Sequence, residues 1–507
     1  MVIKILLLVV FFAGMVAVGI SARRHAVSVS GFVLGGRSVG PWLTAFAYGT
    51  SYFSAVVFVG YAGQFGWKYG LASTWIGLGN AAIGSLLAWV MLGRRTRIMT
   101  QHLGSSTMPD FFEKRFDSKP LKIVASVIIF IFLIPYTASI YNGLSRLFEM
   151  AFNIPYAVCV VVMAAFTAVY VILGGYMATA ISDFIQGIIM LFGIVVVVAA
   201  VLSGQGGFMN AVYELAQLPS DAAPTLGQPG AFTAFFGPDP VNLLGVVILT
   251  SLGTWGLPQM IQKFYAIRNE KAVRTGTVIS TVFAVIVSGG CYFLGGFSRL
   301  FDDPAIYGAD GAVVYDSIIP FMLSKLPDIL IGIVVVLVLS ASMSTLSSLV
   351  LTSSSTLTLD LIKGNLWKNM REESQIRTMR VLIAVFVAVS VLLAINPPDF
   401  IAQLMGISWG ALAGAFLAPF LYGIYWKRVT RAAVWASFAC GVGLTVGNLF
   451  FHFIDSAINA GAAAMVLGLV VVPVVSLITP RQPDKRLQEI FSCYEEKTVL
   501  HKKMVVG

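Results

Sequence analysis

The segment Ala341–Ser348 concentrates hydroxyl groups inside the apolar run Ile331–Leu351. Its positions spaced i, i+3, i+4 and i+7 share one helical face: Ala341, Ser344, Thr345 and Ser348. Ser347 is adjacent to that face. Hydroxyl and carbonyl oxygens at short range, with no positive charge in the segment, suit a hard cation that has lost its water. The alternative is a packing seam, because small and hydroxylated residues let membrane helices approach closely.

The composition places these residues in a membrane. Of 507 residues, 58% are apolar and 11% are charged, and the mean hydropathy is +0.87. Soluble domains carry about 25% charged residues. The apolar runs have the length of a membrane-crossing helix, and lipid requires internal backbone hydrogen bonding. We therefore expect an all-α polytopic membrane protein. The four cysteines and four histidines show no disulfide or metal-site spacing.

The apolar runs predict thirteen spans: 2–21, 42–66, 72–94, 120–149, 154–174, 181–203, 242–266, 273–299, 314–358, 378–396, 400–425, 430–452 and 458–479. The first is interpreted as a retained helix rather than a signal peptide. The ninth is longer than a bilayer requires, so it is tilted or split by a short turn.

Basic residues alternate between loops. One set of loops holds Arg23, Arg24, Arg94, Arg95, Arg97, Lys114, Arg115, Lys263, Arg268, Lys271, Arg274, Lys363, Lys368, Arg371, Arg377, Lys427, Arg428 and Arg431. The other set is poor in them: 67–71, 204–240, 300–313, 397–399 and 453–457. Basic loops stay cytoplasmic. This explains the +10 charge without a nucleic-acid partner. In the cell membrane, the N-terminus is expected outside and the tail 480–507 inside. The tail is interpreted as a solvated segment with a short helical stretch, Lys485–Tyr494.

Two spans carry helix interruptions at mid-depth. Ala47–Val56 contains a glycine and several hydroxyls, and Thr250–Gln259 contains two glycines and a proline. Each opens a block of five spans, as in transporters built from inverted repeats; kinks tolerated by packing are the alternative. The inverted-repeat interpretation divides the chain into six parts. They are a first helix with its linker (1–40), the first repeat (41–204), an outer loop (205–240), the second repeat (241–426), two further spans (427–480) and the tail (481–507).

Asp183 opens the sixth predicted span. It has two interpretations: an N-cap at the membrane surface, or an intramembrane carboxylate that binds a cation.

Several motifs are missing from the chain. There is no Gly-x4-Gly-Lys-Ser/Thr phosphate loop, no Thr-Val-Gly-Tyr-Gly potassium filter and no hydrolase or zinc-protease motif. We therefore expect neither an enzyme nor an ATP-driven pump.

The motifs that are present resemble those of the sodium:solute symporters, most closely the bacterial sodium/proline branch. They are Leu34-Gly-Gly-Arg-Ser-Val-Gly-Pro41, Ile172-Leu-Gly-Gly175 with Ser182-Asp-Phe-Ile-Gln186, Met343-Ser-Thr-Leu-Ser347 and Trp426-Lys-Arg-Val-Thr-Arg431. The resemblance covers residues 1–480. It implies a LeuT-like core of five plus five inverted-repeat helices and alternating access driven by sodium.

The resemblance also implies ion ligands. One sodium ion would be held by carbonyls of Thr50, Phe53 and Ala341 with the hydroxyls of Ser344 and Thr345. Some members of the family hold a second sodium with an aspartate and three serines. The matching positions here are Asp183, Ser344, Ser347 and Ser348, so two sodium ions per solute are expected.

The solute site matches the family less closely. Tyr136 and Pro258 align with residues of the proline site, but Tyr52 and Val56 replace the second-span aspartate and tryptophan. The expected solute-binding residues are Tyr52, Tyr136, Trp255, Pro258, Gln259 and Trp409, beside Phe53; packing is the alternative role for the aromatic ones. Proline or another small amino acid is the expected solute. The alternatives are a monocarboxylate, pantothenate, a sugar, an uncoupled channel or a transporter-like sensor. No obligate protein partner is implied.

Overall fold

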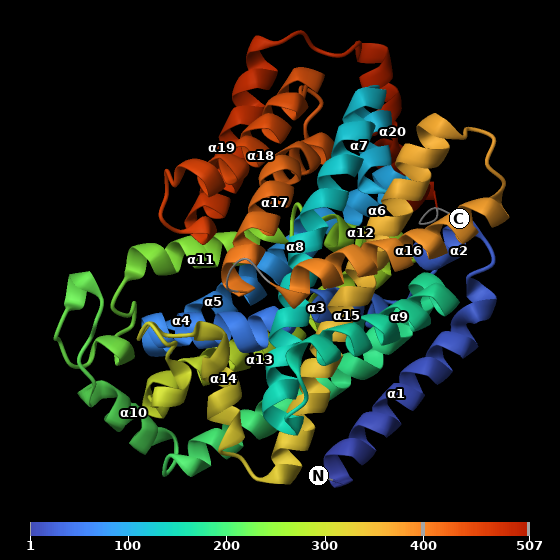
Figure 1. Ribbon diagram of the computed structural model, residues 1–507. Coiled ribbons are helices and arrows are strands. Elements are labelled where there is room, and N and C mark those ends of the chain that lie inside the picture. Colours follow the sequence, from blue (N-terminus) through green and yellow to red (C-terminus); the bar gives the residue numbers. More distant parts are fainter. Residues whose placement is uncertain (1, 397–400, 504–507) are drawn as a thin grey trace.

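The computed structural model describes residues 2–396 and 401–503, and across these ranges the chain is helical with no strand (Figure 1). Eleven helical stretches of the described residues are long and apolar enough to cross a membrane. Two of them, Val56–His102 and Tyr156–Gly204, have 47 and 49 residues, about twice what one crossing needs. The all-helical membrane architecture is thus confirmed, whereas the count of thirteen spans stays a prediction.

The functional residues lie on a central group of helices: α3 (Pro41–Tyr52), α8 (Lys119–Phe152), α9 (Tyr156–Gly204), α11 (Pro240–Gly253), α12 (Pro258–Ala266), α13 (Glu270–Gly295), α15 (Asp328–Thr356) and α17 (Ile401–Tyr425). Peripheral helices cover them: α1 (Val2–Ala22), α16 (Glu372–Ile395), α18 (Arg431–Phe451) and α19 (Ala457–Ile478). Figure 1 shows α17, α18 and α19 packed together at one end of the bundle and α1 along the opposite edge.

Helix α15 forms the centre of the bundle. It packs against α1, α3, α8, α9 and α16, and its residues from Leu337 to Thr356 are all buried. A helix that is buried on every side needs no polar face for solvent. The hydroxyl groups of Ala341–Ser348 therefore face other helices, and each must find its partner inside the protein.

Both predicted helix interruptions are present. Helix α3 ends at Tyr52, and the chain resumes as a π-helix at Val56–Tyr61. Helix α11 ends at Gly253, and α12 starts at Pro258, where a proline at the first helical position needs no N–H partner. The freed backbone groups of the first break lie beside α15, since α3 and α15 are in contact.

The other boundaries are refined by the structure. The ninth predicted span is split into α14 (Tyr315–Ser324) and α15 by a short turn. Of the two alternatives predicted for it, tilted or split, the second is correct. The separation predicted between 174 and 181 is present but shorter: α9 consists of two helical segments that meet at a kink at Gly175, whose φ is +56°. A Cβ there would lie 2.9 Å from Phe32, so glycine allows both the backbone conformation and the contact.

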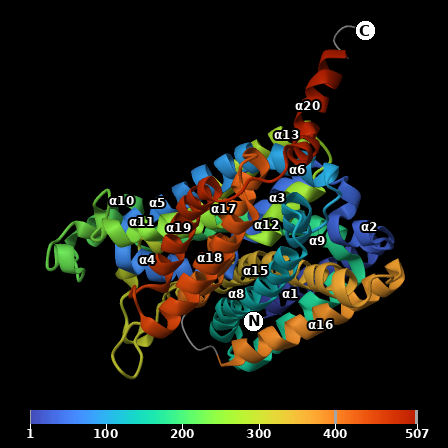
Figure 2. The same ribbon diagram turned by 90° about the horizontal axis from the view of Figure 1, so that it is seen from above.

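Several helices lie in segments expected to be loops: α6 (Arg94–His102), α7 (Met108–Phe116) and α10 (Phe208–Gln217). The tail forms α20 (Asp484–Lys503), which projects from the bundle in Figure 2. Its start is not simply solvated, because Leu487, Ile490 and Phe491 are buried. The predicted outer loop 397–399, the predicted start of the eleventh span at 400 and the last residues of the tail, 504–507, lie outside the described residues.

Candidate ion and solute sites

A cluster of uncharged oxygens joins the break of α3 to α15. The hydroxyls of Ser344 and Thr345 each lie 3.1 Å from the carbonyl oxygen of Thr50. Both also reach the carbonyl oxygen of Ala341, at 3.0 and 3.1 Å. All four residues are buried. We call Thr50, Ala341, Ser344 and Thr345 the neutral cluster. Four of the five residues predicted for the first sodium ion are thus brought together.

Phe53, the fifth predicted residue, lies directly after α3 in the break. It lines a small apolar cavity together with Ala341 and Met190. Its ring stacks on Tyr52 at 4.2 Å between centroids. The break therefore connects the neutral cluster to the aromatic residues described below.

A second cluster, one helical turn further along α15, contains charges. The Lys263 ammonium donates to the Ser348 hydroxyl at 2.9 Å and lies 3.7 Å from Oδ2 of Asp183. The Lys263 and Asp183 side chains are 2% and 0% exposed. Ser348 is also within 2.8 Å of the Ser51 hydroxyl. We call Asp183, Lys263 and Ser348 the charged cluster.

The charged cluster corrects two interpretations from the sequence. Asp183 lies inside α9 and is fully buried, so it is not an N-cap at the surface. Lys263 was assigned to a basic loop, but it lies in α12 among buried residues. The signal available in the sequence was its position five residues after Pro258, within a short apolar helix. Ser347, grouped with Asp183 by the resemblance, donates to the carbonyl of Ser344 at 2.9 Å.

Three of the predicted solute residues form an aromatic group. The Trp409 ring of α17 lies 6.1 Å from Tyr52 and 5.9 Å from Tyr136, centroid to centroid. Gly253, the last residue of α11, allows this approach: a Cβ there would lie 2.3 Å from the Trp409 ring. The Tyr52 hydroxyl donates to the carbonyl of Thr250 at 2.5 Å and so ties the two interrupted helices together.

Buried polar atoms without partners occur in and near this group. The Trp409 indole N–H and the Tyr136 hydroxyl interact with each other but make no hydrogen bond of good geometry. Within the described residues, neither amide atom of Gln259 has a hydrogen-bond partner. Unsatisfied buried donors cost about 1–3 kcal/mol each, so they mark positions where a polar ligand would be stabilised. Gln259 and Pro258 form the first turn of α12. Trp255 differs, since its indole already donates to the carbonyl of Ile83 at 3.0 Å.

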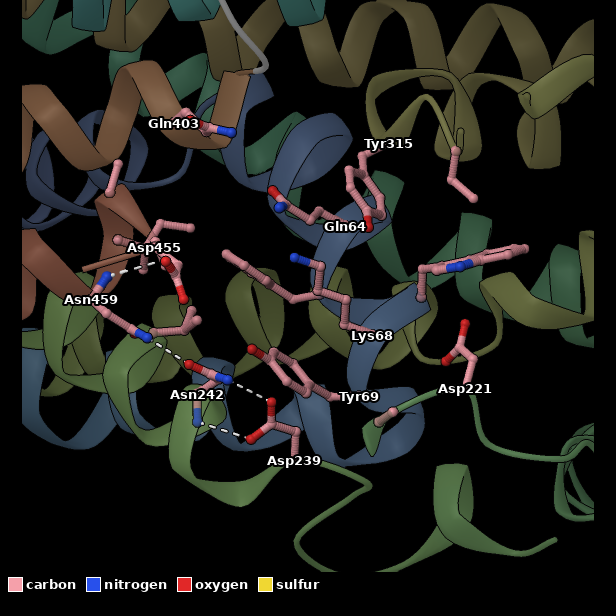
Figure 3. Close-up of a pocket in the computed structure, with 18 of the residues that line it drawn as sticks. Gln64, Lys68, Tyr69, Asp221, Asp239, Asn242, Tyr315, Gln403, Asp455 and Asn459 are labelled. Carbon is pink, nitrogen blue, oxygen red and sulfur yellow. Dashed lines mark hydrogen bonds between the residues drawn. The ribbon is translucent and has the colours of Figure 1, made fainter. Parts of the chain in front are cut away.

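A polar cavity of about 610 Å³ lies at one end of the bundle, between α4 (Ala62–Tyr69), α11, α14 and α17 (Figure 3). Lys68 lies 5.1 Å from the Tyr315 ring. On another wall, Asn459 donates to Asn242 at 2.5 Å and Asn242 to Asp239 at 2.6 Å. Gln403 lines the cavity six residues before Trp409, about 9 Å along α17. None of Tyr52, Tyr136 and Trp409 lines the cavity, so the aromatic group lies deeper in the bundle.

A network of ion pairs joins α7, the beginning of α8 and the π-helix Leu357–Leu366 that follows α15. Lys122 contacts Asp110 at 3.0 Å, Glu113 at 2.8 Å and Asp360 at 3.5 Å. Burial acts to raise the pKa of Asp110, but Lys122 and Lys114 hold it below the usual value. The carboxylate therefore stays charged and keeps these segments together. The loops here are those that the charge pattern places in the cytoplasm.

A bundle whose two interrupted helices meet at a buried hydroxyl face has the construction of a secondary transporter. The model of the sodium:solute symporter family matches residues 32–441, and the chain belongs to that family. This confirms the resemblance seen in the sequence motifs.

Curated relatives align over most of the chain. The osmoregulated proline transporter of Bacillus subtilis is 28% identical over 497 residues, covering 96% of this chain and 97% of its own. The sodium/proline symporter of Escherichia coli K12 is 28% identical over 447 residues, 86% of each chain.

Solved structures share the fold. A Na⁺-coupled sialic acid symporter superposes with a TM-score of 0.77 at 17% identity, covering 95% of this chain and 98% of its own. A nucleobase-cation-symport-1 family transporter gives 0.52 at 13% identity, with 90% and 97% covered. These likenesses bear out the LeuT-like transporter fold.

Proposed function

We propose that this chain imports a small amino acid, with proline as the first candidate, together with sodium. The family supplies the sodium-coupled class, and two curated relatives are named for proline. The solute's carboxylate and the ion's charge travel together, so the inward sodium gradient drives uptake.

Sodium binds at the neutral cluster in this proposal. The observation that carries it is the convergence of two hydroxyls from α15 on the Thr50 carbonyl at the break of α3. Carbonyls freed by an interrupted helix, completed by hydroxyls of a facing helix, are the oxygen donors that transporters offer to sodium. The hydroxyl protons can turn to the Ala341 carbonyl and leave lone pairs for the ion. Phe53 supplies the remaining carbonyl.

The solute binds between Tyr52, Tyr136 and Trp409, against the first turn of α12. Uncapped N–H groups and the positive end of a helix dipole favour an anion, so this turn suits the carboxylate. Gln259 adds an amide donor there, Pro258 shapes the turn, and Trp255 closes the side facing Ile83. The apolar rings suit a pyrrolidine or a short aliphatic side chain. A monocarboxylate or pantothenate shares the carboxylate; a sugar lacks it.

The orientation follows the charge rule: N-terminus outside and tail cytoplasmic. In this orientation the cavity of Figure 3 faces outward, and the Lys122 network closes the cytoplasmic side. The proposed solute residues Tyr52, Tyr136 and Trp409 are buried between the two, so import requires the outer path and then that network to open in turn. Arg37 assists closure, donating to the carbonyls of Tyr265 and Ser105.

Counterflow in proteoliposomes tests this function. Labelled proline, other amino acids, monocarboxylates, pantothenate and sugars are offered with sodium, with lithium, or with neither. We expect sodium-stimulated exchange of proline or a related small amino acid. Exchange at the same rate without sodium, lithium or a proton gradient contradicts symport, and exchange of a sugar alone contradicts the carboxylate site.

A further inference from the structure

From the geometry of the charged cluster, we infer that the Lys263 ammonium is a tethered cation that takes the place of a second sodium ion. The proposal rests on the proposed sodium symport, because it specifies how many ions that symport carries. It predicts one sodium ion per solute. The sequence resemblance implied two.

The first argument is position. Asp183 and Ser348 are two of the residues that the resemblance assigns to a second ion, and the Lys263 ammonium lies between them. It reaches Ser348 at hydrogen-bond distance, and its approach to Asp183 is that of an ion pair. The Tyr176 ring lies 5.3 Å from the same ammonium, so the charge is enclosed on a third side.

The second argument is charge. A buried carboxylate requires a compensating cation, and neither oxygen of Asp183 has a hydrogen-bond partner in the described part of the chain. Lys263 supplies that cation, so the pair has no net charge. A sodium ion about 4 Å from the ammonium would be repelled, which weakens its binding about a thousandfold at an effective dielectric constant of 20.

The third argument is covalent attachment. Lys263 belongs to α12, the second half of an interrupted helix, whereas Asp183 belongs to α9 and Ser348 to α15. The ammonium therefore joins three helices as an ion would. It cannot leave with the solute, however, so it restores its own site in every cycle and carries no net charge across the membrane.

Equilibrium binding of ²²Na⁺ to the purified, full-length protein tests the inference without knowledge of the solute. We expect one ion per wild-type chain. Lys263→Met keeps an unbranched side chain but removes the charge, so it should bind one ion more than the wild type. Lys263→Arg keeps the charge and should bind the wild-type number. Asp183→Asn/Lys263→Met removes the carboxylate as well and should lose the additional ion.

Two results would overturn the inference: two ions on the wild type, or the same number on Lys263→Met as on the wild type. If Lys263→Met is not monodisperse, the number of ions bound by the wild type decides. One ion per chain supports the inference, and two ions overturn it. Failure of the proposed function looks different. The wild type would then bind no ion and show no sodium-stimulated exchange, whereas a gain of one ion on Lys263→Met would still support the tethered cation.

Discussion

The neutral cluster joins α3 to a buried face of α15, and the charged cluster joins α9 and α12 to the same face about one helical turn further along. Their oxygens are similar, since each includes serine hydroxyls, but only the charged cluster contains ionisable side chains. In the proposed mechanism, the neutral cluster takes its cation from solution. The charged cluster already has one, attached to α12. In our proposal, a side chain therefore satisfies the positions that the resemblance assigns to a second ion.

This difference has an energetic consequence for transport. The membrane potential contributes about 2.3 kcal/mol per charge per 100 mV. A transporter that moves one sodium ion gains that amount once per solute, whereas one with two ions gains it twice. If Lys263 occupies the second ion site, the transporter can maintain only a smaller solute gradient. It also uses fewer sodium ions for each solute that it imports.

The largest expected effect comes from removing the neutral cluster. Ser344→Ala/Thr345→Ala deletes two oxygen ligands of an ion, each of which contributes about 1.5–3 kcal/mol. We expect the sodium concentration for half-maximal uptake to rise about a thousandfold. Ser342→Ala is the matched control, because that hydroxyl donates to the Val338 carbonyl of its own helix. If the double variant kept sodium-stimulated uptake at the wild-type sodium concentration, the neutral cluster would not be the sodium site.

Breaking the charged cluster from its acidic side should mainly lower stability. Asp183→Asn leaves the Lys263 ammonium buried without a counter-charge, which costs about 3 kcal/mol. Sodium cannot compensate a missing negative charge, so the unfolding midpoint should fall at all sodium concentrations. In Lys263→Met, by contrast, added sodium should restore the unfolding midpoint. Thermal unfolding in detergent, measured at several sodium concentrations, distinguishes the two variants. A sodium-dependent recovery of Asp183→Asn would contradict the assigned charges.

Lys122 is a second buried lysine. Its proposed role is to hold the cytoplasmic side closed, whereas that of Lys263 is to occupy an ion site. Lys122→Met removes three ion pairs at the proposed cytoplasmic side, so the inward-open form should become more populated. With the native cysteines replaced, a cysteine at Thr356 should be alkylated about tenfold faster from the cytoplasmic side. Lys114→Met is the control, since its pair with Asp110 is partly exposed and such pairs contribute about 1 kcal/mol or less. Unchanged alkylation in Lys122→Met would contradict the closing role.

The smallest expected effect is on the solute. Tyr136→Phe removes a hydroxyl that interacts with the Trp409 indole but makes no hydrogen bond of good geometry, so stability should change little. The apparent KM for the solute should rise about fivefold to tenfold if the hydroxyl binds it, with the sodium dependence unchanged. Tyr156→Phe is the control, because its hydroxyl donates to the Ala394 carbonyl at 2.6 Å, away from the aromatic group. Equal KM values for both variants would exclude Tyr136 from the solute site.

The sequence predicted the elements of the fold and most of the neutral cluster. Helical spacing placed Ser344 and Thr345 on one face, and Gly49, Gly253 and Pro258 indicated the two breaks. It could not predict which side chain reaches the charged cluster, because Lys263 and Asp183 are eighty positions apart and meet only through tertiary packing. Lys263 also lies close in sequence to Arg268, Lys271 and Arg274, so its positive charge predicted a cytoplasmic loop and not a buried position. The helices α6 and α7 were missed because both are rich in charged residues, and α10 because its 10 residues are too few to cross a membrane.

The central claim is that one sodium ion moves with each solute, and accumulation at equilibrium measures this number. Proteoliposomes containing the wild-type protein are clamped at zero membrane potential with a tenfold inward sodium gradient, and the final ratio of internal to external solute is determined. One ion per solute predicts a ratio of about ten. A ratio of about one hundred would show two ions and contradict the account, and a ratio of one would contradict sodium coupling itself.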